Sequence, residues 1–162
     1  MHTRLITAED TIPLRQALLR PGRPVEESIY AGDHDATSFH VGAFENDNPD
    51  GMAVGIATML LADDPRCEAA PAFRLRGMAV AASHQKTGYG SAALQFAEAE
   101  AGRRGGVIVW CNAREIAVPF YRRNGYETVG DVFSLPNIGP HFFCRKRLAD
   151  QSLSQKENGH RS

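Results

Sequence analysis

The stretch "VAASHQKTGYGSAALQF" (Val80–Phe96) constrains the fold of this chain more than any other segment. An apolar run typical of a strand ends in a polar loop, two glycines follow with the spacing G-x-G, and an alanine-rich pattern typical of a helix comes next. Such a loop can bind an anion, because free backbone amides and the helix dipole both favour negative charge at a helix N-terminus. Three interpretations are open: an ordinary turn, a dinucleotide-binding loop and a pyrophosphate-binding loop.

The dinucleotide interpretation fits poorly. Gly88, Gly90 and Ala93 satisfy G-x-G-x-x-A, but that fingerprint places its first glycine directly after the strand and an acidic residue about 20 positions later. Here a long polar loop separates Val80 from Gly88, and the next strand ends in "WCN" without an acid. A Walker loop fails as well, because the lysine precedes the second glycine. A longer loop suits a pyrophosphate held by the amides of residues 85–91.

Hydrophobic periodicity predicts alternating strands and helices along most of the chain. Strands are expected at 4–7, 37–44, 52–61, 72–81, 106–111, 126–135 and 141–148, and helices at 7–20, 91–102 and 117–124, with a helical turn within 23–36. Thr7 and Asp10 have the spacing of a capping box at the start of the first helix. This order of elements predicts an α/β (mixed α+β) fold, in which helices cover both faces of a mixed sheet.

The length of 162 residues predicts a single domain at residues 1–148, followed by a polar tail at 149–162 that we expect to be disordered. The net charge of −1 gives no global field that would recruit nucleic acid or an anionic membrane. No secretory signal is visible, and no apolar run approaches the ~20 residues of a membrane span. The cysteines and histidines form no metal-binding pattern, so we expect reduced thiols, no metal and a cytoplasmic protein.

Two blocks of this sequence resemble the GNAT superfamily of acyl-CoA-dependent N-acetyltransferases. "QKTGYG" (85–90) matches the motif Q/R-x-x-G-x-G/A, and it stands after the strand "LRGMAV" and before a long helix. "WCNAREIAVPFYRRNGYETVG" (110–130) is similar to the family's strand, asparagine and short helix ending in F-Y-x-x-x-G-Y/F. The resemblance covers residues 72–130, and it implies a splayed, mostly antiparallel sheet of six to seven strands.

The resemblance also implies acetyl-CoA as the acyl donor and indicates which residues bind it. The main chain of residues 78–80 would bind the pantetheine arm, the loop at 85–91 would bind the pyrophosphate, and Asn112 would reach the pantetheine from the other side. A simple helix cap is the alternative role for Asn112. The residues expected to bind the cofactor are Met78, Ala79, Val80, Gln85, Lys86, Thr87, Gly88, Tyr89, Gly90, Ser91 and Asn112.

Tyr121 occupies the tyrosine position of the family's F-Y motif, which implies a general acid that protonates the leaving thiolate. The alternative is a core tyrosine. Arg74 and Arg76 alternate along one strand and are candidates for binding a carboxylate on the acceptor substrate, the alternative being a surface ladder paired with acids. The general base stays open between an acidic or histidine side chain (Glu68, His40 or His141) and a chain of waters.

The sequence thus predicts an N-acetyltransferase that moves an acetyl group from acetyl-CoA to the amine of a small molecule or peptide by direct attack in a ternary complex. A ping-pong route through Cys111 is disfavoured because no histidine lies near it in the sequence. A non-catalytic acyl-CoA-binding or regulatory module with the same fold is the alternative, and nucleotide binding is a weaker one. The acceptor amine is not specified, and the oligomeric state is open, with a homodimer as one option.

Overall fold

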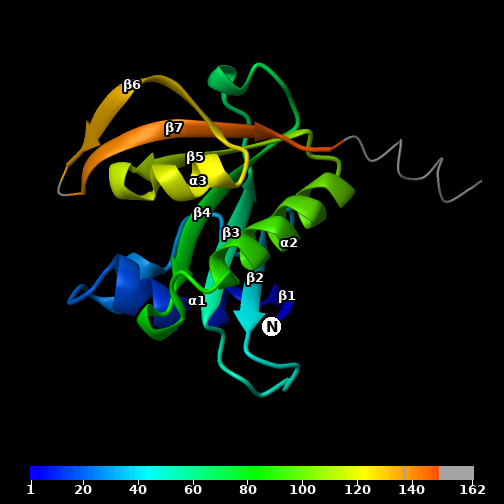
Figure 1. Ribbon diagram of the computed structural model, residues 1–162, viewed down its shortest axis with the longest axis vertical. Helices are drawn as coiled ribbons and strands as arrows, with labels where there is room; N and C mark the ends of the chain where they lie inside the picture. Colours follow the sequence, from blue (N-terminus) through cyan, green and yellow to red (C-terminus); the bar gives the residue numbers. More distant parts are fainter. Residues whose placement is uncertain (137, 150–162) are drawn as a thin grey trace, which may run out of the picture. The chain divides into compact units, whose positions relative to one another are not determined.

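The computed structural model describes residues 1–136 and 138–149 of the chain (Figure 1). The expected tail at 149–162 lies, apart from its first residue, outside the described residues. The elements are β1 (His2–Ile6), α1 (Ala8–Leu14), the π-helix η1 (Arg15–Leu19), η2 (Val25–Ser28), β2 (Phe39–Phe44), β3 (Gly55–Leu61), η3 (Pro65–Cys67), β4 (Ala72–Val80), η4 (Ala82–His84), α2 (Tyr89–Arg103), β5 (Ile108–Arg114), η5 (Glu115–Ala117), α3 (Val118–Arg123), β6 (Glu127–Leu135) and β7 (Gly139–Arg147).

The strands are hydrogen-bonded in the order β1-β2-β3-β4-β5-β7-β6. β1, β2 and β3 pair antiparallel, as do β5 with β7 and β6 with β7, whereas β4 and β5 pair parallel. The expected α/β fold with a mixed, mostly antiparallel sheet is therefore confirmed. No helix in the described part of the chain is long and apolar enough to cross a membrane.

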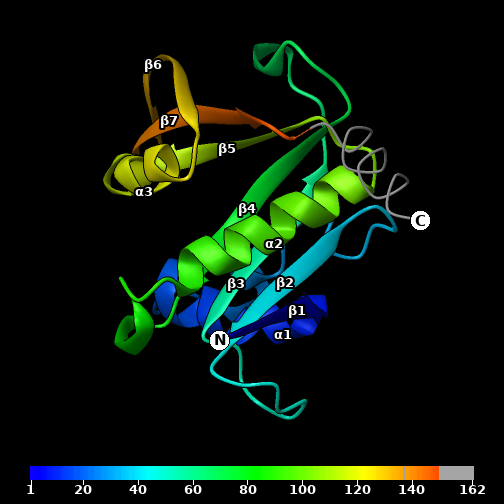
Figure 2. The same ribbon diagram turned by 45° about the vertical axis from the view of Figure 1, so that its right-hand side comes forward.

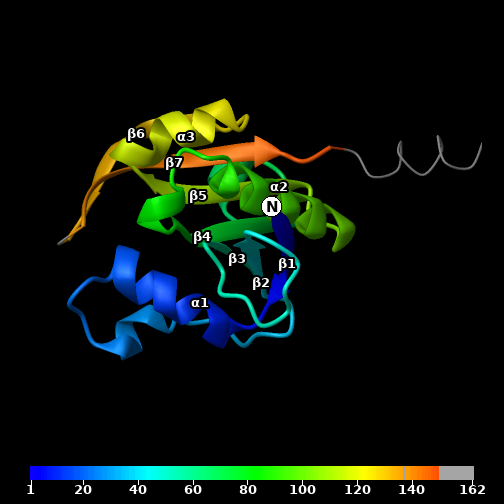
Figure 3. The same ribbon diagram turned by 60° about the horizontal axis from the view of Figure 1, so that its bottom comes forward.

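The chain divides into two compact units, and the predicted single domain at 1–148 stays a prediction. The first unit contains Met1–Leu61 and Leu75–Ala97. In it α1 and α2 lie on opposite faces of the strands (Figures 2 and 3). The alanine stripe predicted for α2 is buried against the sheet, since Ala93, Leu94 and Ala97 are fully covered.

The first helix differs from the single helix expected over 7–20. Its start is as predicted, because the Thr7 side chain accepts from the Asp10 amide while the Asp10 carboxylate accepts from the Thr7 amide. α1 then contains Pro13, which has no N–H to donate to the preceding turn. The following turns widen into η1, and the Arg20 amide bonds to the Arg15 carbonyl at 2.9 Å, five residues back.

The second unit contains Ala62–Arg74 and the described residues from Glu98 onward. α3 runs alongside β5 and β7 (Figure 1), and Pro119 stands in its first turn. The core of this unit is centred on Trp110, which stacks on Phe143 with ring centroids 5.3 Å apart. The Trp110 indole N–H donates to the Ala62 carbonyl at 2.8 Å, so its one polar group is satisfied.

Candidate active site

The 85–91 segment follows β4 and η4 in the first unit: residues 85–88 form a turn, and residues 89–91 are already the first turn of α2, which begins two residues earlier than the expected helix at 91–102. The segment is tied to β4 by the Gln85 side-chain amide, which donates to the Val80 carbonyl at 3.1 Å. Lys86 and Gly88 have positive φ angles of 61° and 93°, which turn the backbone back toward the helix. The amides of residues 85–88 donate to no group in the part of the chain that the structure describes. The loop therefore offers free donors before a helix N-terminus, the arrangement that binds a phosphate.

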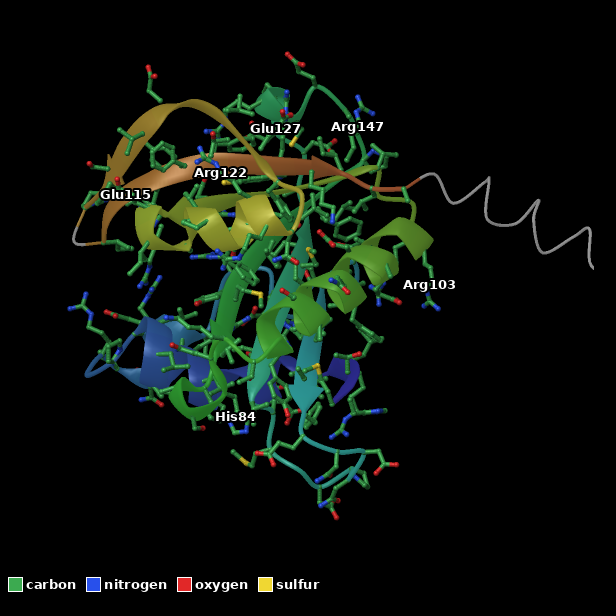
Figure 4. All side chains as sticks on the ribbon, viewed as in Figure 1. His84, Arg103, Glu115, Arg122, Glu127 and Arg147 are labelled. Carbon is green, nitrogen blue, oxygen red and sulfur yellow. The ribbon has the colours of Figure 1, made fainter. Side chains whose placement is uncertain are left out.

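The glycine at position 88 leaves the loop open. A Cβ added there would meet only the Met1 Cε atom, at 3.7 Å, within 4 Å. His84 lies just before the loop, as labelled in Figure 4, and its ring bonds to Ser83 Oγ and Glu45 Oε1 at 2.7 and 2.6 Å. These contacts give His84 a structural role beside the loop.

β4 loses its regular backbone near its middle. Gly77 has a φ of 64°, between Arg76 and Met78. The parallel pairing of β4 with β5 covers only Ala72–Arg74 and Ile108–Trp110, although each strand continues beyond it. The main chain of residues 78–80, which the sequence assigned to the cofactor, belongs to this continuing part of β4.

Asn112 lies inside β5, which runs on to Arg114, rather than at the end of the strand. The helix-cap alternative for Asn112 is therefore wrong, because the next helical turn begins only at Glu115. The Asn112 Oδ1 atom is buried and accepts no hydrogen bond from any described residue. A buried acceptor without a donor is costly, so this atom fits a ligand that brings an amide N–H, as pantetheine does.

Tyr121 lies in α3 and is 6% exposed. Its hydroxyl is hydrogen-bonded to the thiol of Cys111, on β5. Burial raises the pKa of Tyr121 well above its usual range, and the neighbouring Cys111 and Cys144 thiols raise it further. The phenol thus stays protonated at neutral pH, as a general acid requires, and it is a core tyrosine at the same time.

Cys111 does not have the environment of a nucleophile. The hydrogen bond with the Cys144 thiol raises the pKa of Cys111 well above its usual range, and burial is the second cause of this rise. An activated thiol needs the opposite shift. All three cysteines, Cys67, Cys111 and Cys144, are buried and free.

The two candidate substrate arginines contact different rings. The Arg74 Cζ atom lies 5.1 Å from the centroid of Trp110, and the Arg76 Cζ atom lies 4.2 Å from the centroid of Tyr30. Both are partly buried. No ion pair involves Arg76 among the described residues, so the surface-ladder alternative does not describe it.

Of the three candidates for the base, two are poorly suited. Both ring nitrogens of His40 are engaged, Nδ1 with the Thr58 hydroxyl at 2.8 Å and Nε2 with the Asp33 carbonyl at 2.9 Å. Glu68 is exposed and lies 3.7 Å from Arg145. His141 donates through Nδ1 to the Gly139 carbonyl at 2.8 Å, and in the neutral ring this leaves the lone pair on Nε2.

Sequence reasoning missed a buried network centred on Arg15, in η1. Its guanidinium binds Asp33 through two bonds of 2.7 and 3.0 Å and donates to the Thr58 hydroxyl at 2.7 Å. A bidentate arginine–carboxylate pair is the strongest common side-chain ion pair. No local pattern marks it, because its partners lie 18 and 43 positions away in the sequence.

Residues 8–126 match the acetyltransferase (GNAT) family, and the chain belongs to this family. YitI of Bacillus subtilis (strain 168), an uncharacterized N-acetyltransferase, is 34% identical over 148 residues, which are 91% of this chain and 97% of YitI. The predicted family and enzyme class are confirmed.

Solved structures share the fold at low sequence identity. An aminoglycoside 6'-N-acetyltransferase complexed with coenzyme A has a TM-score of 0.71 and 16% identity, over 93% of this chain and 99% of that chain. The aminoglycoside 6'-N-acetyltransferase from Enterococcus faecium has a TM-score of 0.70 and 18% identity, with the same coverage of 93% and 99%. At this identity the likeness shows the fold alone.

Proposed function

We propose that the protein acetylates an amine by direct attack of the amine on the thioester of acetyl-CoA. The observation that carries the proposal is the turn at residues 85–88, whose amides donate to no described residue and precede α2 in a chain of the GNAT family. Acetyl-CoA supplies an acyl group that is activated as a thioester. The amides of residues 85–88 would hold its pyrophosphate, and Asn112 Oδ1 would accept an amide N–H of its pantetheine arm.

Tyr121 is proposed to protonate the departing thiolate. Removal of the amine's proton is left to His141 or to a chain of waters, since His40 is fully engaged. The raised pKa of the Cys111 thiol supports direct transfer without an acyl-enzyme. Free thiols at all three cysteines support the proposed cytoplasmic location.

Calorimetric titration of acetyl-CoA into three proteins tests the proposal: wild type, Gly88→Trp and Gly105→Trp. The two glycines form a matched pair, because their φ angles are 93° and 92° and both are exposed. Both variants carry the same backbone strain, but only Gly88→Trp fills the 85–91 loop. We expect Gly88→Trp to weaken binding at least about tenfold, a loss of ~1.4 kcal/mol, and Gly105→Trp to bind like wild type.

Failure of the wild type to bind acetyl-CoA would overturn the proposal. If Gly88→Trp binds acetyl-CoA as tightly as wild type, the proposal that this loop holds the pyrophosphate is wrong. Thiol release with a panel of amines then separates an enzyme from the non-catalytic alternative, which binds acetyl-CoA without turnover.

A further inference from the structure

Two arginines stack on Tyr30 in the first unit, and the charge of a third acts on one of them. The Cζ atoms of Arg15 and Arg76 lie over the Tyr30 ring, 3.9 and 4.2 Å from its centroid. Arg20 is close enough for its charge to act on Arg76. Asp33 is the acid that faces this cluster.

The charges of the cluster do not balance. Both oxygens of Asp33 bind Arg15, and Oδ2 also accepts the Tyr30 amide at 2.9 Å, so the carboxylate is fully used. Among the described residues Arg20 and Arg76 have no ion pair, and the Arg20 guanidinium donates only to the Leu19 carbonyl. Three guanidinium charges therefore face one carboxylate charge.

Arg76 is also held partly out of water. Burial lowers the pKa of its guanidinium, and the positive charges of Arg20 and Arg15 lower it further. Tyr30 and Asp33 act to raise this pKa. A guanidinium nevertheless stays charged in proteins. A cation with reduced hydration and no counterion is stabilised by an anion that comes from outside the chain.

Polar atoms beside the cluster also lack partners. Arg15 Nε and Ser28 Oγ are both buried, and neither has a hydrogen-bond partner within residues 1–136 and 138–149. Gly77 packs closely on the cluster, because a Cβ there would lie 3.1 Å from Tyr30 Cε2 and 3.2 Å from Arg15 Nε. Natural proteins rarely leave buried polar groups unsatisfied unless a ligand or water completes them.

We propose that Arg76 and Arg20 bind a carboxylate of the acceptor, so that the amine acetylated by this protein also carries a carboxylate, as an amino acid or a peptide C-terminus does. The inference rests on the proposed acetyltransferase function. Stacking on Tyr30 leaves the N–H groups at the edge of the Arg76 guanidinium, and this planar fork matches the two oxygens of a carboxylate.

Acetylation kinetics at saturating acetyl-CoA test the inference with matched amines: free amino acids, their α-carboxamides and the corresponding aminoalkylphosphonates. We expect kcat/KM for the acids to exceed that for the amides by about 10- to 100-fold, the range for one charge-assisted hydrogen-bonded contact. Arg76→Gln and Arg20→Gln should each reduce this preference, mainly through KM. Arg76→Lys should retain part of it, because the charge stays while the fork is lost.

Arg103→Gln is the matched control. Arg103 stands in the last turn of α2 (Figure 4), its side chain is 68% exposed and it pairs with Glu100. Arg103→Gln should keep the wild-type preference for the acids over the amides. The acetyl-CoA affinity of every variant is measured in parallel, which shows that the variants are folded.

The outcomes separate the two proposals. If the wild type binds acetyl-CoA and acetylates amides as well as acids, the carboxylate inference is overturned and the proposed function stands. If the wild type acetylates only the aminoalkylphosphonates, the inference of a carboxylate-bearing acceptor is overturned as well. If the wild type binds no acetyl-CoA, both proposals fall.

Discussion

The hydroxyl groups of Tyr121 and Tyr126 have different hydrogen-bond partners, and this difference bears on catalysis. Their rings pack edge to face, with centroids 5.4 Å apart, and burial raises the pKa of both phenols well above the usual range. The Tyr126 hydroxyl donates to Glu98 at 2.8 Å, and Glu98 also forms a partly buried ion pair with Lys146. The Tyr121 hydroxyl is instead hydrogen-bonded to the Cys111 thiol, a weak partner that a stronger base can replace.

The two tyrosines therefore make a matched test of the general acid. Tyr121→Phe should lower kcat by about 100-fold, the lower range for loss of general acid catalysis. Tyr126→Phe should leave kcat near that of wild type and lower the free energy of unfolding by about 1 kcal/mol, because Glu98 loses a donor. Thiol-release kinetics and urea unfolding of both variants measure these effects. An equal loss of kcat in both would assign Tyr121 to the core alone.

The residues predicted from the sequence are those that local motifs mark. Gly88, Asn112 and Tyr121 each stand in a short block of the sequence. The structure places Gly88 in the turn before α2 and Tyr121 in α3 as expected, whereas Asn112 lies inside β5 and not after its end. Arg15 and Asp33 form the strongest polar contact in the first unit, yet no pattern indicates them. Their pairing depends on chain folding across 18 positions, which periodicity does not encode.

At the scale of elements, Arg15 connects segments that carry little regular structure. Its guanidinium joins η1 to the loop at Asp33 and to β3 at Thr58, and His40 extends the network to β2. Sequence periodicity predicted the start of this helix correctly. It did not predict the π-helical turns, because they follow from Pro13 and from the burial of Arg15, not from a hydrophobic repeat.

The Arg15–Asp33 pair should make stability depend on pH. Burial acts to raise the pKa of Asp33. The hydrogen bonds from Arg15 and from the Tyr30 amide nevertheless hold this pKa below its ordinary value. Because the pKa is lower in the folded state, the contribution is complete above the unfolded value of about 4 and is lost as the pH falls further. Urea unfolding from pH 7 to pH 3 should show this loss.

Asp33→Asn measures the same contact at neutral pH. It should lower the free energy of unfolding by about 3–5 kcal/mol, because it leaves the buried Arg15 charge without its counterion. Asp64→Asn is the control, since Asp64 pairs with the half-exposed Arg66 and should cost at most about 1 kcal/mol. The variant Asp33→Asn should also lose the extra acid sensitivity of the wild type. Equal effects of the two substitutions would contradict a stabilising role for the buried pair.

At the scale of the whole molecule, a ligand that binds only the folded chain stabilises it by mass action. Acetyl-CoA at 100 times its dissociation constant should add about 2.7 kcal/mol, which corresponds to a rise in Tm of roughly 5–10 °C for a chain of 162 residues. Differential scanning calorimetry with wild type, Gly88→Trp and Gly105→Trp measures this rise. Gly105→Trp should show the full rise, whereas Gly88→Trp should show at most about half of it, because tenfold weaker binding leaves ~1.4 kcal/mol at the same concentration.

ATP at the same concentration is the comparison that decides between cofactors, because it carries adenine and phosphates without pantetheine or a thioester. A loop that binds phosphates alone would give ATP the same effect on Tm as acetyl-CoA. The free Asn112 Oδ1 atom predicts a larger effect of acetyl-CoA on Tm, since of the two ligands only acetyl-CoA supplies pantetheine amide donors to this atom. We therefore expect a smaller rise with ATP, and Asn112→Ala should reduce the effect of acetyl-CoA while leaving that of ATP unchanged. An equal rise with both ligands in the wild type would favour the nucleotide-binding alternative.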